Sequence, residues 1–183
     1  LNIFSKNQVG YKNLLNIISS AYMNHKENAY VDIEQLYKNK EGLLVLSGGN
    51  NSILKYSNGN NITSQSASFV ADFKKEFIDN FYIEIQRIEG NHYRIDEEVI
   101  LNLAYDNNIP VVATNDVYFE GPDHFEAHDA LMCIEKKLFV SQKDRKRLSK
   151  NHYFKSQNEM QELFSDIPEA LFNTIEIAQR CSH

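Results

Sequence analysis

The sequence predicts an α/β protein in which parallel strands alternate with helices. Residues 43–46 (LLVL) and 109–114 (IPVVAT) are apolar runs of strand length, as is typical of strands covered on both faces in a parallel sheet. Longer segments between and around them carry apolar residues three and four positions apart, the spacing of one helix face. This alternation favours a sheet flanked by helices.

Four strands are expected, at residues 1–4, 43–46, 81–86 and around residue 111. Residues 81–86 (FYIEIQ) alternate apolar and polar side chains, as strands do. Helices are expected at residues 8–22, 33–37, 66–79, 96–107, 125–135, 159–164 and 168–180. The first of these helices would pack through Leu14, Leu15, Ile18 and Ala21, with Asn7 as its cap. Residues 58–63 form a polar linker.

The composition narrows the class of function. The 183 residues carry a net charge of −6, so the chain alone is a poor candidate for gripping DNA. No apolar run approaches the about 20 residues that span a membrane. Cys133 and Cys181 lie in no metal or redox spacing, which favours reduced thiols in a cytoplasmic protein. Because the first residue is Leu, we expect a piece of a longer or processed protein.

Polar side chains gather where the strand near residue 111 ends, in Thr114-Asn115-Asp116. In α/β proteins, chemistry is placed at the carboxyl ends of parallel strands. Asp116 is therefore a candidate functional residue, and the alternative is a carboxylate that caps the next element or hydrogen-bonds its own loop. His124 and His128 are spaced to share a helix face and to bind zinc, although packing of His128 is the plainer interpretation. The other histidines are expected to be solvated: His25, His92, His152 and His183.

Several motifs resemble the PHP (polymerase and histidinol phosphatase) domain of bacterial DNA polymerase III alpha subunits. In that family a similar strand ends in A-T-N-D-x-H, and this chain has A-T-N-D-V-Y at residues 113–118. The other similar motifs follow in the family's order: residues 10–14 (GYKNL), 44–48 (LVLSG), 81–86 (FYIEIQ), 127–134 (AHDALMCI), 153–160 (YFKSQNEM) and 164–181 (FSDIPEALFNTIEIAQRC).

This resemblance implies an incomplete PHP-type (βα)7-like barrel that corresponds to the later two-thirds of the domain, over residues 1–183. The family's opening H-x-H strand is not in the sequence, and three or four strands are too few to close a barrel. Residues 136–152 form a basic connector that is either a solvated surface or faces DNA in the complete protein. Residues 153–183 would be closing helices that lead towards the polymerase region.

The resemblance also locates a metal site that has lost most of its ligands. Family members with an active site hold about three metal ions. The resemblance places three ligand positions in this chain, at Gly49, Asp116 and Tyr118. Glycine has no side chain to bind metal, and a phenol with a pKa near 10 is a poor ligand at neutral pH. Asp116 would remain as a vestigial ligand, and a metal cluster that activates water needs several. No catalytic residue and no cofactor are therefore expected in the fragment.

The implied parent is a DNA-directed DNA polymerase, a nucleotidyltransferase of DNA replication that uses Mg²⁺ bound outside this chain and contacts DNA. The fragment would be an inactive scaffold that docks the proofreading exonuclease (epsilon) subunit, among the other polymerase III holoenzyme subunits. One alternative is a metal-dependent PHP-family phosphoesterase or 3′–5′ exonuclease, which would need a histidine at Tyr118. Another is an interaction module with no catalytic parent.

Overall fold

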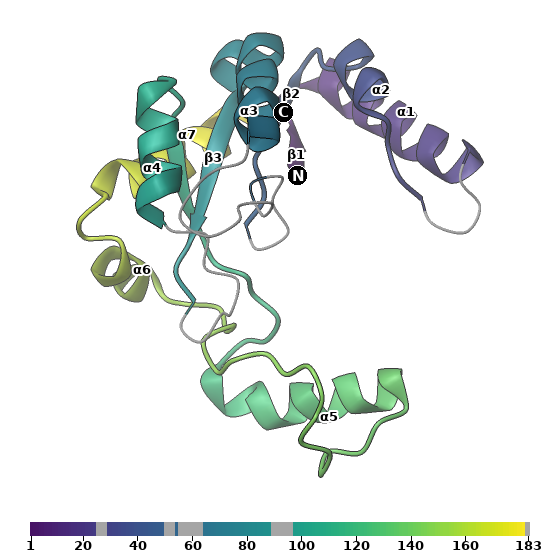
Figure 1. Ribbon diagram of the computed structural model, residues 1–183, viewed down its shortest axis with the longest axis vertical. Helices are drawn as coiled ribbons and strands as arrows, with labels where there is room; N and C mark the ends of the chain where they lie inside the picture. The colour runs from purple at the N-terminus through teal and green to yellow at the C-terminus, as the bar shows by residue number, and fades with distance from the viewer. Residues whose placement is uncertain (25–28, 50–53, 55–63, 89–96, 182–183) are drawn as a thin grey trace.

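The strands form one mixed sheet in the computed structural model, which describes residues 1–24, 29–49, 54, 64–88 and 97–181 (Figure 1). Its four described strands lie in the order β1-β2-β3-β4. They are β1 (Asn2–Ser5), β2 (Leu43–Leu46), β3 (Phe81–Gln86) and β4 (Val111–Thr114). The sheet places four strand ends beside one another, and these ends carry most of the polar side chains discussed below.

The prediction of a wholly parallel sheet is wrong at β1. Strands β2, β3 and β4 are parallel, but β1 pairs with β2 in the antiparallel direction, with Ser5 opposite Leu43. The helical segment between β1 and β2 leads the chain away from the end of β1 and then back to that same end of the sheet, where β2 begins. The backbone N–H of Lys6 accordingly donates to the carbonyl of Gly42 at 2.8 Å, next to the start of β2.

The helices cover both faces of the sheet and extend beyond one end of it (Figure 1). The helices formed by the described residues are α1 (Gln8–Asn24), α2 (Ile33–Lys38), α3 (Ser64–Phe77), α4 (Glu97–Asp106), α5 (Phe125–Lys136), α6 (Gln157–Leu163) and α7 (Pro168–Arg180), with short 3-10 turns η2 (Ile78–Asn80) and η3 (Pro122–His124). None of these helices is long and apolar enough to cross a bilayer. The expected linker at 58–63 lies outside the described residues.

Helix α1 begins as predicted, and Leu14 and Ala21 of its predicted face pack inward, but Leu15 and Ile18 do not. The side-chain Oδ1 of Asn7 accepts from the backbone N–H of Gly10 at 2.9 Å, so Asn7 caps the helix. Ile17 and Ala21 are buried, whereas Leu15 and Ile18 are nearly half exposed. The face is set by Gly10, where a Cβ atom would overlap the carbonyl of Gly42. This close backbone contact turns the Leu15 side of α1 outward.

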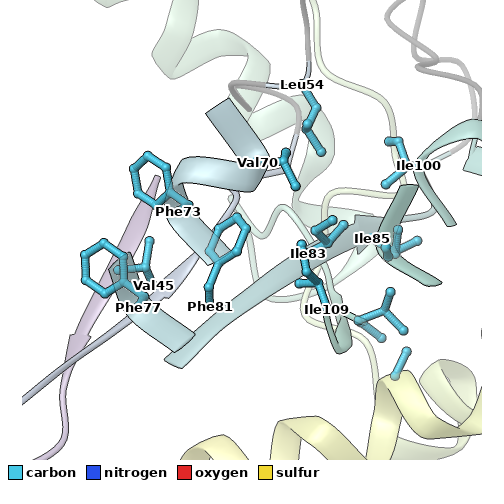
Figure 2. Packing of buried hydrophobic residues seen from close by; sticks show 14 of the residues in the cluster. Val45, Leu54, Val70, Phe73, Phe77, Phe81, Ile83, Ile85, Ile100 and Ile109 are labelled. Carbon is cyan, nitrogen blue, oxygen red and sulfur yellow. The ribbon is translucent and has the colours of Figure 1, made fainter. Parts of the chain in front are cut away.

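The main core lies on one face of the sheet, beneath α3 and α4. Its aromatic centre is Phe73, whose ring centroid lies 5.6 Å from that of Phe77 and 5.4 Å from that of Phe81 (Figure 2). Ile83 and Ile85 continue the same row along β3 (Figure 2). These residues alternate with Tyr82 and Glu84, which are buried too. The alternating pattern of β3 therefore marks two covered faces.

The opposite face of the sheet packs against α7. This second core comprises Leu44, Leu46, Tyr82, Val112 and Ile177. The amide Nδ2 of Asn173 donates to the carbonyl of Val111 at 2.7 Å, so α7 also covers the backbone of β4. Tyr82 is the largest side chain in this core, and its hydroxyl donates to Glu176 Oε1 at 3.0 Å.

Residues 120–152, here called the α5 arm, extend away from the sheet (Figure 1). The chain after α5 folds back along the helix, and a buried ion pair fixes it there. Arg145 Nη1 lies 2.5 Å from Asp129 Oδ1, and the two side chains are 3% and 2% exposed. Arg145 therefore departs from the interpretation of residues 136–152 as a solvated basic surface, because its charge is neutralised inside the arm.

Candidate functional site

The carboxyl ends of β3 and β4 meet around the buried carboxylate of Glu84. Asn2 Nδ2 donates to Glu84 Oε2 at 2.9 Å, and Gln86 Nε2 donates to Oε1 at 3.1 Å. The hydroxyl of Thr114 donates to the same Oε1 at 2.5 Å. The backbone N–H of Glu84 donates to Ser47 Oγ at 2.9 Å. One carboxylate, 5% exposed as a residue, therefore connects β1, β3 and β4 through neutral hydrogen-bond donors, while the backbone of Glu84 contacts Ser47 just after β2.

The sequence interpretation missed Glu84 because a polar residue in an alternating strand looks solvent-facing. The flanking strands held the usable signal. Leu43–Leu46 and Val111–Thr114 are apolar on both faces, which requires helices on both sides and buries every residue of the strand between them. A glutamate at such a position has to be hydrogen-bonded, because burying an unpaired carboxylate is costly.

Gly49, one of the three predicted ligand positions, lies beside this cluster. A Cβ atom at Gly49 would overlap the side-chain amide of Gln86. That amide is held by Glu84 and by Thr114 Oγ1, to which Gln86 Nε2 donates at 3.0 Å. The space that a longer side chain at position 49 would need is thus filled by a hydrogen-bonded glutamine.

Asp116, the second predicted position, faces His152. The Nε2 atom of His152 lies 3.8 Å from Asp116 Oδ2, an ion pair when the imidazole is protonated. The backbone N–H of Ser149 donates to the other ring nitrogen, Nδ1, at 3.2 Å, and this leaves Nε2 towards Asp116. The arrangement is no nucleophile triad, because 3.8 Å exceeds a hydrogen bond. His152 is only 4% exposed, so the prediction that it is solvated is wrong.

Tyr118, the third position, packs between two imidazoles. Its ring centroid lies 5.7 Å from that of His128 and 5.7 Å from that of His152. Burial, and secondarily the charge of Asp116, raises the pKa of the Tyr118 hydroxyl above its usual value. The phenol therefore stays protonated and neutral near pH 7. The structure brings Asp116 and Tyr118 together, and it places Gly49 next to Gln86 instead.

The loop that carries Asp116 is fixed to the far end of the α5 arm. The backbone N–H of Tyr118 donates to the carbonyl of His152 at 2.8 Å, and that of Phe154 donates to the carbonyl of Phe119 at 3.0 Å. Asn115 Nδ2 donates to the carbonyl of Tyr153 at 2.6 Å. The loop around Asp116 is therefore braced by Asn115 and by the backbone of Tyr118 and Phe119.

The sequence is similar to that of known proteins. Residues 1–88 match the family model described as the PHP domain. Over 100% of the chain, the sequence is 39% identical to the DNA polymerase III subunit alpha of Caulobacter vibrioides and 37% identical to that of Pasteurella multocida. The chain is similar to these alpha subunits along its whole length. It spans 16% of the length of each of these two relatives.

The homology extends beyond the PHP match. The DNA polymerase III subunit alpha of Vibrio cholerae is 38% identical over 189 aligned positions that take in 100% of the chain. The second half of the chain, with Asp116, Tyr118 and the α5 arm, therefore aligns with alpha subunits as well. The resemblance to alpha subunits is confirmed over the whole chain, and the resemblance to the PHP domain over residues 1–88.

The residues around Asp116 do not fit the multi-ion centre that an active PHP domain implies. Within the described part of the chain, no three His, Cys, Asp or Glu side chains gather closely enough to hold a metal ion. Asp116 and His152 are the two donors that face each other, and Tyr118 covers His152 with a protonated phenol. We derive no reaction step through a metal at this site.

The remaining histidines do not add a ligand set among the described residues. His124 is exposed at the start of α5, while His128 packs against Phe119 with ring centroids 5.5 Å apart. Despite their i, i+4 spacing, the two histidines therefore lie in different surroundings. The packing interpretation holds for His128. His25, His92 and His183 lie outside the described residues.

Proposed function

We propose that this chain is the PHP-containing segment of a longer bacterial DNA polymerase III alpha subunit. The parent would carry out template-directed DNA synthesis in replication, in the cytoplasm, with Mg²⁺ bound outside residues 1–183. The observation that carries the proposal is homology to alpha subunits over 100% of the chain, at 16% of their length. Residues 1–183 would be the later two-thirds of a PHP barrel, and β1, at the end of the sheet order, offers an edge for further strands.

Primer extension by the full-length protein tests the parent activity. With a primed template, Mg²⁺ and the four deoxynucleotides, the protein should lengthen the primer by template-directed steps, and removal of Mg²⁺ by a chelator should stop it. Failure of the full-length protein to extend a primer under conditions in which a homologous alpha subunit does so would contradict the proposal.

Within that parent, we propose that the PHP segment is a scaffold and not a nuclease. Two of the three ligand positions are Gly49 and Tyr118, and the space at Gly49 is filled by Gln86. Asp116 is the vestigial ligand, now opposite His152. The competing function is a metal-dependent phosphoesterase or 3′–5′ exonuclease, and it needs a donor set that the described residues around Asp116 do not supply.

Metal content and 3′-end trimming by the full-length protein separate these functions. The wild type should hold no stoichiometric Zn²⁺ or Mn²⁺ at Asp116, so Asp116→Asn should change neither metal content nor trimming. Tyr118→His should raise metal uptake, whereas Tyr11→His, at a tyrosine of similar exposure, should not. Adding Gly49→Cys requires Gln86→Ala as well, to clear the occupied space. Stoichiometric metal and trimming that are both lost in Asp116→Asn would establish the nuclease function instead.

We further propose that the segment docks the proofreading exonuclease (epsilon) subunit within the polymerase III holoenzyme. A parent whose own PHP site cannot trim 3′ ends needs this activity from another chain. The test is sedimentation of the full-length protein with the purified exonuclease subunit, which should co-migrate as one species. Two species that stay separate at micromolar concentrations would argue against this partner.

A further inference from the structure

The tip of the α5 arm exposes a group of large apolar side chains. They come from the last turns of α5 and the turn after it: Leu131, Ile134, Leu138, Phe139 and Val140. Phe139 is 75% exposed and Ile134 73% exposed, values that a core residue never reaches. We call these five residues the tip patch. Contiguous apolar surface of this kind is typical of an interaction site.

The tip patch is held in one conformation by hydrogen bonds. Lys137 adopts a left-handed conformation (φ 55°) that ends α5, and the N–H of Leu138 donates to the carbonyl of Cys133 at 2.8 Å. The N–H of Phe139 donates to Gln142 Oε1 at 2.7 Å, and that of Gln142 returns to the carbonyl of Phe139 at 3.0 Å. The exposed phenyl ring therefore stands on a fixed turn.

The buried ion pair of the arm reaches this turn directly. Arg145 Nη2 donates to the carbonyl of Val140 at 3.2 Å, while its two terminal nitrogens bind Asp129. The Nε atom of Arg145 is buried without a hydrogen-bond partner. A charged pair taken out of water is a weak source of stability but a strong constraint on geometry. Here it fixes an apolar turn in solvent, and such preorganisation lowers the entropy cost of binding.

Lysines flank the tip patch along the sequence although the chain as a whole is acidic. Lys136, Lys137, Lys143 and Lys146 are exposed, and no ion pair between described residues involves them. Glu135 and Asp144 are the intervening acidic residues, so the rim is net basic in a chain of net charge −6. A partner with acidic side chains would be attracted to this rim, and two copies of it would repel each other.

We propose that the tip patch binds an amphipathic, acidic peptide segment of another protein. Large apolar side chains of that segment would pack on Ile134 and Phe139, with its carboxylates facing the rim lysines. Single-stranded DNA is the other polyanion to consider, but base stacking uses aromatic rings, and four of the five patch residues are aliphatic. The proposal uses only the geometry of the arm, so it does not depend on the proposed polymerase function.

A random 16-residue peptide display library tests the proposal. The library is first selected on the full-length protein and then counter-selected on its Ile134→Ser/Phe139→Ser variant. Peptides specific for the wild type should be net acidic and carry large apolar residues. Measured by fluorescence anisotropy, they should bind the double variant at least about tenfold more weakly, a loss of about 1.4 kcal/mol. Lys136→Glu/Lys143→Glu should also weaken binding, and added salt should weaken the wild-type complex.

Matched controls use exposed residues elsewhere in the chain. Phe172→Ser/Ile175→Ser on α7, with 69% and 56% exposed side chains, should leave binding within about twofold, as should Lys12→Glu/Lys75→Glu. The proposal is overturned if selection yields no peptide that discriminates the wild type from the tip variant, or yields net basic peptides. It is also overturned if a 20-residue oligothymidine binds the wild type and loses affinity in the tip variant while the selected peptides do not.

Discussion

At the scale of single residues, Glu84 is the side chain that the sheet depends on most. Its carboxylate accepts from Asn2, Gln86 and Thr114, which belong to β1, β3 and β4. The donors are neutral, so they satisfy the hydrogen-bonding capacity of the carboxylate without an ion pair. Loss of the acceptor removes three part-buried hydrogen bonds and leaves the Thr114 hydroxyl without this partner, which costs more than an exposed hydrogen bond would.

We expect Glu84→Ala to lower the free energy of unfolding by about 2–4 kcal/mol, because it combines unpaired donors with a cavity. Urea unfolding followed by circular dichroism measures this change. Glu162→Ala, at an exposed glutamate on α6, is the control and should stay within about 0.5 kcal/mol of the wild type. Equal midpoints for the two variants would mean that Glu84 does not tie the strands together.

Asp129 makes the stability of the α5 arm depend on pH. Hydrogen bonds from Arg145, and secondarily from Arg147, lower its pKa from 3.8 to about 2. Since the folded-state pKa lies below the unfolded-state value, the ion pair stabilises the fold above about pH 4, and this contribution is lost as the pH falls from 4 towards 2.

Asp129→Asn should therefore unfold at a lower urea concentration than the wild type at pH 6, and the two midpoints should converge at pH 2. The physical reason is that the wild-type carboxyl becomes protonated over this interval and is then uncharged, like the side-chain amide of the variant. Urea titrations at pH 6, 4, 3 and 2 provide the measurement. A gap that stays constant down to pH 2 would show that Arg145 does not depress the pKa of Asp129.

At the scale of elements, local signals predicted where helices and strands lie better than how they pack. The bounds of α7 and β2 follow from the proline at Pro168 and from the apolar run Leu43–Leu46. The face of α1 did not follow, because Leu15 and Ile18 are as apolar as Ile17, and a backbone contact 32 positions away chooses between them. The direction of β1 also depends on a long-range return of the chain.

Gly10 is the residue through which that backbone contact acts, so Gly10→Ala should destabilise the protein by about 1–3 kcal/mol. The added methyl group would overlap the carbonyl of Gly42, which is backbone and cannot rotate away. Gly121→Ala is the matched control, because its methyl group would meet only the carboxylate of Asp123, the end of a flexible side chain. Thermal or urea unfolding compares the two, and a Gly10→Ala midpoint no lower than that of Gly121→Ala would contradict the prediction.

At the scale of the whole molecule, stability depends on covering the sheet on both faces. The α3 side is rich in phenylalanine, whereas the α7 side is a smaller core of five buried residues. Arg180 at the end of α7 reinforces the smaller side by donating to the carbonyl of Asp79 at 2.9 Å and to the hydroxyl of Tyr82 at 2.6 Å. Helix α7 therefore covers and reinforces the smaller core.

Ile177→Ala should cost about 2–4 kcal/mol of unfolding free energy, since Ile177 is buried against the sheet. Ile175→Ala, two positions earlier on the same helix, removes the same atoms from a side chain that is 56% exposed, so it should change stability by less than about 0.5 kcal/mol. Urea midpoints of the pair provide the measurement. Similar losses for both substitutions would mean that α7 does not pack as described.

The candidate site could be predicted in part, and the limit is physical. Asp116 was found because it follows a buried strand, which is a local signal, whereas Tyr118 was identified only through the family resemblance. His152 lies on a distant segment, and nothing in Asn151-His152-Tyr153 marks it as buried opposite Asp116. Gln86 could not be foreseen beside Gly49 either, because the glutamine comes from the neighbouring strand.

The bridge between Phe119 and Tyr153 has a topological consequence. Because these residues pair side by side, the chain leaves the body of the protein and returns to it at the same point, with 33 residues of arm between them. Because the two ends of the α5 arm lie side by side, the arm can lengthen, shorten or be exchanged while the sheet keeps its geometry. A change of length or sequence within the arm therefore leaves the pairing of the sheet strands intact.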